Sequence, residues 1–195
     1  TAGTEGTIKL DGNSPTGSCN VALGSDALSN NTTGYNNTAI GSTTLCCNTT
    51  GTENTAVGLA ALYANTEASC NTAVGSRSLC SNTTGAYNVA VGGESLKTNT
   101  TGEWNVGIGN QALLANSTGS ENVAMGKNAL YTNSTGCYNS AVGYAALKSN
   151  TTGGDNIAVG VNALRNNTTG SRNTATGSYA LYANTIGANN VAMGR

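Results

Sequence analysis

The sequence contains no histidine and no phenylalanine, and it has only one proline and one tryptophan. Without histidine, the usual Ser–His and Cys–His nucleophile pairs and zinc sites built on histidine cannot form. Charged residues make up only 9% of the chain, and no cluster of lysine or arginine points to nucleic acid. No run of apolar residues is long enough to span a bilayer. The large apolar side chains are too few for one thick globular core.

What the sequence has in abundance is internal repetition. From Asn20 onward, a 17-residue unit recurs eleven times without a change of register, with asparagine first and glycine four residues later. Positions are numbered below from this asparagine, which is position 0. A strict period of this length indicates a solenoid, because each short unit is stable only when it stacks on its neighbours. Residues 1–18 precede the repeat as a lead-in, and the solenoid domain is expected over residues 19–195.

The composition of the repeat indicates the kind of solenoid. Position +2 is mostly alanine, position +3 is mostly valine, isoleucine or methionine, and position +8 is leucine from Leu28 to Leu181. β-Branched residues favour strands, whereas Gly, Asn and Thr favour turns, so we expect two short strands and two turns per unit. Helical repeats need roughly 33 to 47 residues and are excluded. The expected fold is an all-β parallel solenoid, or β-roll, with coils about 4.8 Å apart and a rod roughly 50 Å long.

The asparagines are interpreted as structural. In a stacked β-assembly, asparagine side chains form ladders in which each amide bonds the next. The residues assigned to this ladder are Asn54, Asn71, Asn88, Asn105, Asn122, Asn139 and Asn156.

The strand after each asparagine predicts self-association. Its alternate residues, such as Val89 and Val91, face one side, and the residues between them face the other. One chain can bury only one of these faces, which leaves a stripe of Val, Ile and Met along the rod. Monomers rarely expose such patches, so identical copies are expected to meet around an axis with the stripe inward.

The motif itself resembles known repeats. The units N-V-A-V-G (Asn88 to Gly92) and N-I-A-V-G (Asn156 to Gly160) resemble repeats in the head domains of trimeric autotransporter adhesins. The longer form T-T-G-x-x-N-x-A-V-G-x-x-A-L-x-x-N is similar to repeats in bacteriophage tail fibres. The resemblance covers residues 20–195 and implies a left-handed β-roll, a side-by-side homotrimer and a role in host attachment. The adhesin heads use a shorter repeat, which favours the phage fibres.

Neither catalysis nor a cofactor or metal site is expected. Carboxylates recur at position −1 as Glu53, Glu121 and Asp155, but never as a pair within one unit, so they are interpreted as a solvated face. Acid pairs for glycoside cleavage between chains are an alternative.

The six cysteines lack a C-x-x-C spacing, which argues against metal binding. If each unit folds about its +4 glycine, position −1 lies opposite position +9, which predicts a disulfide between Cys70 and Cys80. Free thiols are the alternative, whereas a disulfide would suit an extracellular or virion surface.

Two variable columns are candidates for surface or receptor contacts. Aromatic residues stack on sugar rings, and tyrosine is enriched at contact surfaces. The alternative is that the coil edges merely tolerate them. The candidates are Tyr87, Trp104 and Tyr138 at position −1, and Tyr63, Tyr131 and Tyr182 at position +9.

The Asn-Thr-Thr-Gly segments admit two interpretations. They contain N-x-S/T glycosylation acceptors, such as Asn82 and Asn99, but turn chemistry alone also explains them.

The leading hypothesis is a structural protein: a homotrimeric stalk from a phage tail fibre or surface adhesin, on a virion or cell surface, contacting a host glycan or protein. Because the chain stops within its eleventh unit, we expect a segment of something longer. The rivals are a self-assembling extracellular filament and an ice-binding solenoid, the latter suggested by Thr-Thr pairs such as Thr83 and Thr84. Those pairs lie in expected turns, whereas an ice-binding face needs a flat strand of outward threonines.

Overall fold

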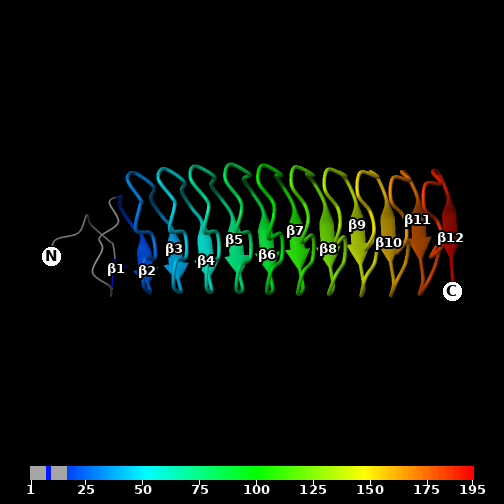
Figure 1. Ribbon diagram of the computed structural model, residues 1–195, viewed down its shortest axis with the longest axis horizontal. Coiled ribbons are helices and arrows are strands. Elements are labelled where there is room, and N and C mark those ends of the chain that lie inside the picture. Colours follow the sequence, from blue (N-terminus) through cyan, green and yellow to red (C-terminus); the bar gives the residue numbers. More distant parts are fainter. Residues whose placement is uncertain (1–7, 10–16) are drawn as a thin grey trace.

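The computed structural model describes residues 8–9 and 17–195, and it shows coils stacked in sequence order along a rod from β2 to β12 (Figure 1). Within the described residues, twelve strands form a single sheet in sequence order. Their bounds are β1 Ile8–Lys9, β2 Val21–Leu23, β3 Thr38–Ile40, β4 Thr55–Val57, β5 Thr72–Val74, β6 Val89–Val91, β7 Val106–Ile108, β8 Val123–Met125, β9 Ser140–Val142, β10 Ile157–Val159, β11 Thr174–Thr176 and β12 Val191–Met193.

All neighbouring strands are parallel, and the repeat sets their register. In a typical pair, Val89 lies beside Val106 and Val91 beside Ile108, a shift of one 17-residue unit. The expected all-β parallel solenoid is therefore confirmed. β1 also joins the sheet, with Ile8 beside Val21, so part of the lead-in extends the solenoid. The remaining residues of the lead-in lie outside the described part of the chain.

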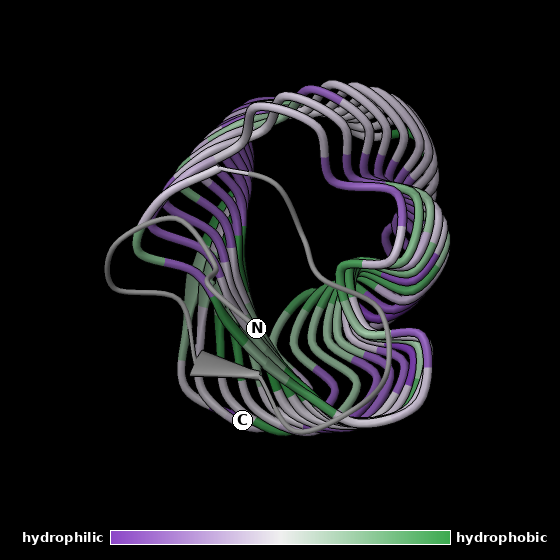
Figure 2. Ribbon diagram, turned by 90° about the vertical axis from the view of Figure 1, so that its left-hand side faces the viewer, coloured by the Kyte–Doolittle hydropathy of each residue, from purple (hydrophilic) through white to green (hydrophobic). Residues whose placement is uncertain are grey.

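The expectation of two strands per unit is wrong, because each coil of the repeat contains one. Viewed along the rod, each coil has a bent, loop-like outline (Figure 2), and outside its three-residue strand the coil consists mainly of turns and bends. The leucine segment does not extend because two of its residues have left-handed backbone, as at Arg77 (φ 56°) and Leu79 (φ 50°). Each left-handed residue costs about 1 to 2 kcal/mol. The conformation is held by stacking, since the Leu79 amide donates to the Ser95 carbonyl of the next coil at 3.0 Å.

The core is thin and similar from coil to coil. Alanine at position +2 and leucine at position +8 are fully buried, as at Ala90 and Leu96. Glycine at position +4 allows the coils to approach closely: a Cβ added at Gly92 (φ 127°) would lie 2.7 Å from the carbonyl atoms of Gly109. Position +4 therefore excludes any side chain.

The asparagines at position 0 form a ladder, but the bond that recurs in it runs from a backbone amide to a side-chain oxygen rather than between side-chain amides. In the central coil, the Asn88 backbone amide donates to Asn71 Oδ1 at 2.9 Å, and Asn88 Nδ2 donates to the Gly102 carbonyl at 2.8 Å. The backbone bond recurs in every coil from Asn37 to Asn190. Side-chain to side-chain bonds join only some of these asparagines, for example Asn105 to Asn88 at 3.2 Å.

A second asparagine ladder runs through position +11. Asn99 Nδ2 donates to Asn82 Oδ1 at 2.8 Å and to the Gly102 carbonyl at 2.9 Å. The Gly102 carbonyl therefore accepts from two asparagines, Asn88 and Asn99, and this pair of bonds closes the coil. Sequence reasoning named only the first ladder, because the Asn-Thr-Thr-Gly segment also fits a turn or a glycosylation site.

Candidate functional site

One side of the sheet is an exposed apolar surface. We define the apolar face as the outward side chains at positions +1 and +3 of β2 to β12. Position +3 is apolar except at Thr176, and position +1 is valine or isoleucine in six of the eleven strands and threonine or serine in the other five. Inward residues such as Ala90 are fully buried, whereas outward Val91 remains 37% exposed and Ile157 45% exposed. The expected stripe is present on the single chain. At position +3, the apolar side chains more than a third exposed are Ile40, Val74, Val91, Ile108, Met125, Val142, Val159 and Met193.

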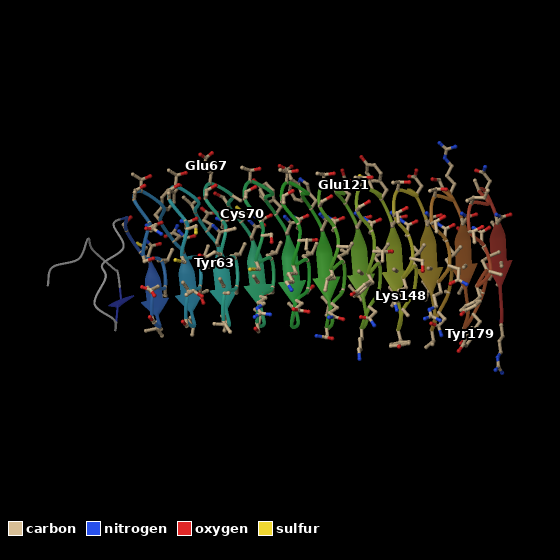
Figure 3. The ribbon with its side chains drawn as sticks, in the orientation of Figure 1. Tyr63, Glu67, Cys70, Glu121, Lys148 and Tyr179 are labelled. Atoms are coloured by element: carbon tan, nitrogen blue, oxygen red, sulfur yellow. The ribbon has the colours of Figure 1, made fainter. Side chains whose placement is uncertain are left out.

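An aromatic column borders the apolar face at position −1. Tyr87 and Trp104, in successive coils, stack with ring centroids 4.1 Å apart and planes 8° from parallel. Next to them lies a shallow, open depression lined by Trp104, Glu121 and Val123. The negative charge of Glu121 raises the pKa of Tyr138, and a hydrogen bond to the same carboxylate adds to the shift. Trp104 and Tyr138 therefore lie on either side of Glu121 (labelled in Figure 3), and Tyr87 lies on the far side of Trp104.

The tyrosines at position +9 are engaged by their neighbours. Lys148 Nζ lies 5.6 Å from the centroid of the Tyr131 ring. Arg165 donates to the Tyr182 hydroxyl at 3.0 Å, with its guanidinium 5.9 Å from the same ring. Tyr63 lies beside the thiols of Cys47 and Cys46, whose charges raise its pKa. Most of this column thus forms contacts within the rod.

The structure lacks the predicted disulfide between Cys70 and Cys80, and both thiols are free. Cys70 Sγ donates to Glu53 Oε2 at 3.5 Å, and burial, followed by that contact, raises its pKa. Burial also raises the pKa of Cys80, although the charges of Lys97 and Arg77 oppose the shift. The two cysteines have different surroundings because the chain does not double back about its +4 glycine as two facing strands.

The glycosylation interpretation also fails for the folded rod. Asn82 and Asn99 are fully buried, and their amide nitrogens donate to the second ladder. An enzyme could not reach these nitrogens without opening the coil.

The threonines do not form an ice-binding strand. Thr83 Oγ1 donates to the Thr100 carbonyl at 3.1 Å, and Thr100 Oγ1 donates to the Ser117 carbonyl at 3.0 Å. These hydroxyls are therefore committed to the next coil, and they lie in a bend rather than in a strand.

The clearest charged cluster surrounds Glu94. Its carboxylate accepts from Lys97 at 2.9 Å and from Gln111 at 2.9 Å, and Arg77 lies 3.8 Å away. The bonds from Gln111 and Lys97 lower the pKa of Glu94. This carboxylate is held ionised between cations, which suits a structural role better than proton transfer.

Within the described residues, no group of three or more cysteine and carboxylate side chains could hold a metal ion. The same part of the chain has no helix long and apolar enough to cross a membrane. Comparisons with protein-family models, curated proteins and solved structures found no match.

Proposed function

We propose that this chain is a structural rod, a segment of a fibre or stalk in which three identical chains associate through the apolar face. The rod would support attachment to a host surface, as part of a viral tail fibre or a cell-surface adhesin. The observation that carries the proposal is the outward row of apolar side chains from Ile40 to Val159.

The apolar face has no evident role in folding one chain. The inward asparagines and alanines of the same strands supply the buried contacts of the coil. The outward valines and isoleucines instead contribute exposed apolar area to a strip that runs the length of the rod. Strips of this extent on soluble proteins mark interfaces, because burial releases roughly 25 cal/mol per Å².

Identical chains are the partner that fits best. A partner must offer an uncharged, straight, apolar surface with the same repeat along the rod, and another copy of this chain has that surface. Cyclic symmetry brings such faces together around an axis parallel to the rod. The choice of three chains rests on the resemblance to trimeric fibres and adhesin heads.

The attachment role rests on the exposed aromatic column. Tyr87, Trp104 and Tyr138 are each about half exposed and lie beside, rather than within, the apolar face. A rod of several chains would display such sites in multiple copies, so weak contacts would add up to useful avidity.

The test compares two charge substitutions. Val91→Asp places a carboxylate in the apolar face, whereas Thr101→Asp adds the same charge at an exposed bend. We expect Val91→Asp to dissociate the assembly, since burying an unpaired carboxylate costs several kcal/mol. Thr101→Asp should leave it intact, and sedimentation velocity would measure both. If the two variants sediment alike, the apolar face is not the interface.

A further inference from the structure

Five successive coils place a distinctive set of side chains at position −1. All five residues have left-handed backbone, with φ between 57° and 60°. Backbone bonds hold the column in register, as from the Glu121 amide to the Glu103 carbonyl at 3.0 Å. The side chains therefore leave the same corner of each coil in the order Tyr87, Trp104, Glu121, Tyr138 and Asp155.

Trp104 has one covered face and one open face. Tyr87 covers the first, stacked at 4.1 Å from the preceding coil. Because the rings are nearly parallel and one coil apart, their planes lie across the rod, and the second face of the indole is directed along it. On that side lies the depression lined by Trp104, Glu121 and Val123.

Tyr138 supplies a second aromatic group beyond this depression. It follows Trp104 by two coils, which corresponds to roughly 9.6 Å at the usual strand spacing. A cation over the open face of Trp104 would lie within the roughly 6 Å over which a cation interacts with an aromatic ring. Glu121 occupies the coil between the two aromatics.

The charges around this depression indicate which class of ligand it can bind. Glu103, Glu121 and Asp155 are acidic, and the first cation further along the column is Arg172. The negative charge of the three acidic side chains attracts a cation, whereas a neutral sugar has no net charge for them to attract. A cation in the depression gains from the open face of Trp104 and from the Glu121 carboxylate.

We propose that the depression lined by Trp104, Glu121 and Val123 binds an alkylated ammonium group, with Glu121 as its counter-ion. Such a group is present in a choline headgroup at a cell surface and in a lysine side chain of a partner protein. The proposal rests on the attachment role for its biological use, but all of its residues belong to one chain, so binding does not require a trimer.

The site contains its own probe, because Trp104 is the only tryptophan in the chain. Choline chloride and Nα-acetyl-lysine amide are titrated separately into the protein while tryptophan fluorescence is recorded. Sodium chloride at equal ionic strength and methyl glucoside serve as controls. We expect a saturable change with at least one of the two cations, at a dissociation constant of about 1 mM, a weak affinity suited to one exposed site. The cation that binds more tightly identifies the source of the ligand.

Three variants locate the binding. Glu121→Gln should weaken it about tenfold, because it removes the counter-ion. Tyr138→Leu should weaken it only about twofold, because Tyr138 acts through its hydrogen bond with Glu121. Glu53→Gln is the matched control: it occupies position −1 between Asn36 and Cys70, without an aromatic neighbour in that column. This variant should bind as tightly as the parent.

The proposal is overturned if both cations act only as sodium chloride does, or if Glu121→Gln binds as tightly as the parent. Saturable binding of methyl glucoside alone would assign the column to glycans instead. The molar mass of the same samples in solution tests the proposed trimer independently of the cation site. A monomer that binds the cation would support the cation site and contradict the trimer.

Discussion

The two sides of each strand in the repeat differ in how completely one chain buries them. The inward side carries Asn and Ala, as at Asn88 and Ala90, which are fully buried with their polar atoms bonded. The outward side carries apolar residues such as Val91 that stay more than a third exposed. The inward side is complete within one chain. The outward side leaves apolar area exposed to water in a single chain. This side is therefore the one expected to contact a partner.

The largest effect should come from crowding the inward side. Gly92→Ala places a Cβ 2.7 Å from the Gly109 carbonyl atoms at a φ of 127°. We expect the free energy of unfolding to fall by about 3 to 5 kcal/mol, from strain and overpacking together. Gly93→Ala is the matched control, since its nearest contact is a side-chain nitrogen 3.4 Å away. Denaturant unfolding would measure both, and equal losses would contradict the account of coil stacking.

Breaking the second ladder should cost somewhat less. Asn99→Ala removes bonds to Asn82 and Gly102, and it removes the acceptor of Asn116 Nδ2 at 2.7 Å. Because buried groups lose their partners, we expect a loss of about 3 kcal/mol. The exposed neighbour Thr101→Ala should change stability by less than about 0.5 kcal/mol. A loss near zero for Asn99→Ala would show that the ladder is incidental.

The Glu94 cluster should contribute far less than either ladder. Its hydrogen bonds lower the pKa of Glu94 in the folded chain. The stabilisation is therefore present above the ordinary carboxyl pKa of about 4.3 and is lost as the pH falls through the lower folded value. Relative to Glu94→Gln, the parent should lose at most about 0.5 kcal/mol between pH 5 and pH 3. Thermal unfolding across that range checks this, and a gain of stability on acidification would reverse the assignment.

The smallest effect is expected at the cysteines. Because Cys70 is free in the structure, Cys70→Ser should change the free energy of unfolding by less than about 0.5 kcal/mol. A disulfide to Cys80 would instead contribute roughly 2 to 3 kcal/mol in the chain-entropy model. Unfolding without reductant, together with alkylation of both thiols, distinguishes the two cases.

The period made the sheet, its register and the first asparagine ladder predictable, because a 17-residue unit leaves few ways to stack. Local propensity misled for Leu79 and its equivalents, since leucine rarely adopts left-handed backbone and only contacts between coils hold it there. The prediction of a disulfide between Cys70 and Cys80 was wrong for the same reason, because it assumed that the leucine segment forms a second strand facing the first. The stack of Tyr87 on Trp104 had a usable signal, because two aromatic residues one period apart must lie side by side in a solenoid.

The depression beside Trp104 could not be predicted in the same way. It depends on Glu121 lying toward Tyr138, which is a choice of side-chain conformation rather than of spacing. The spacing of the repeat shows which residues stack in one column. It does not show where their side chains leave an open space, because that depends on packing.

The most direct test of the central claim is the molar mass of the chain in solution, measured by sedimentation equilibrium at several concentrations. The account predicts a stable species at three times the chain mass of 19.3 kDa, about 58 kDa. A continuous rise of mass with concentration would indicate an open filament instead. A species that stays at 19.3 kDa would contradict the account, because the apolar face would then be exposed to water.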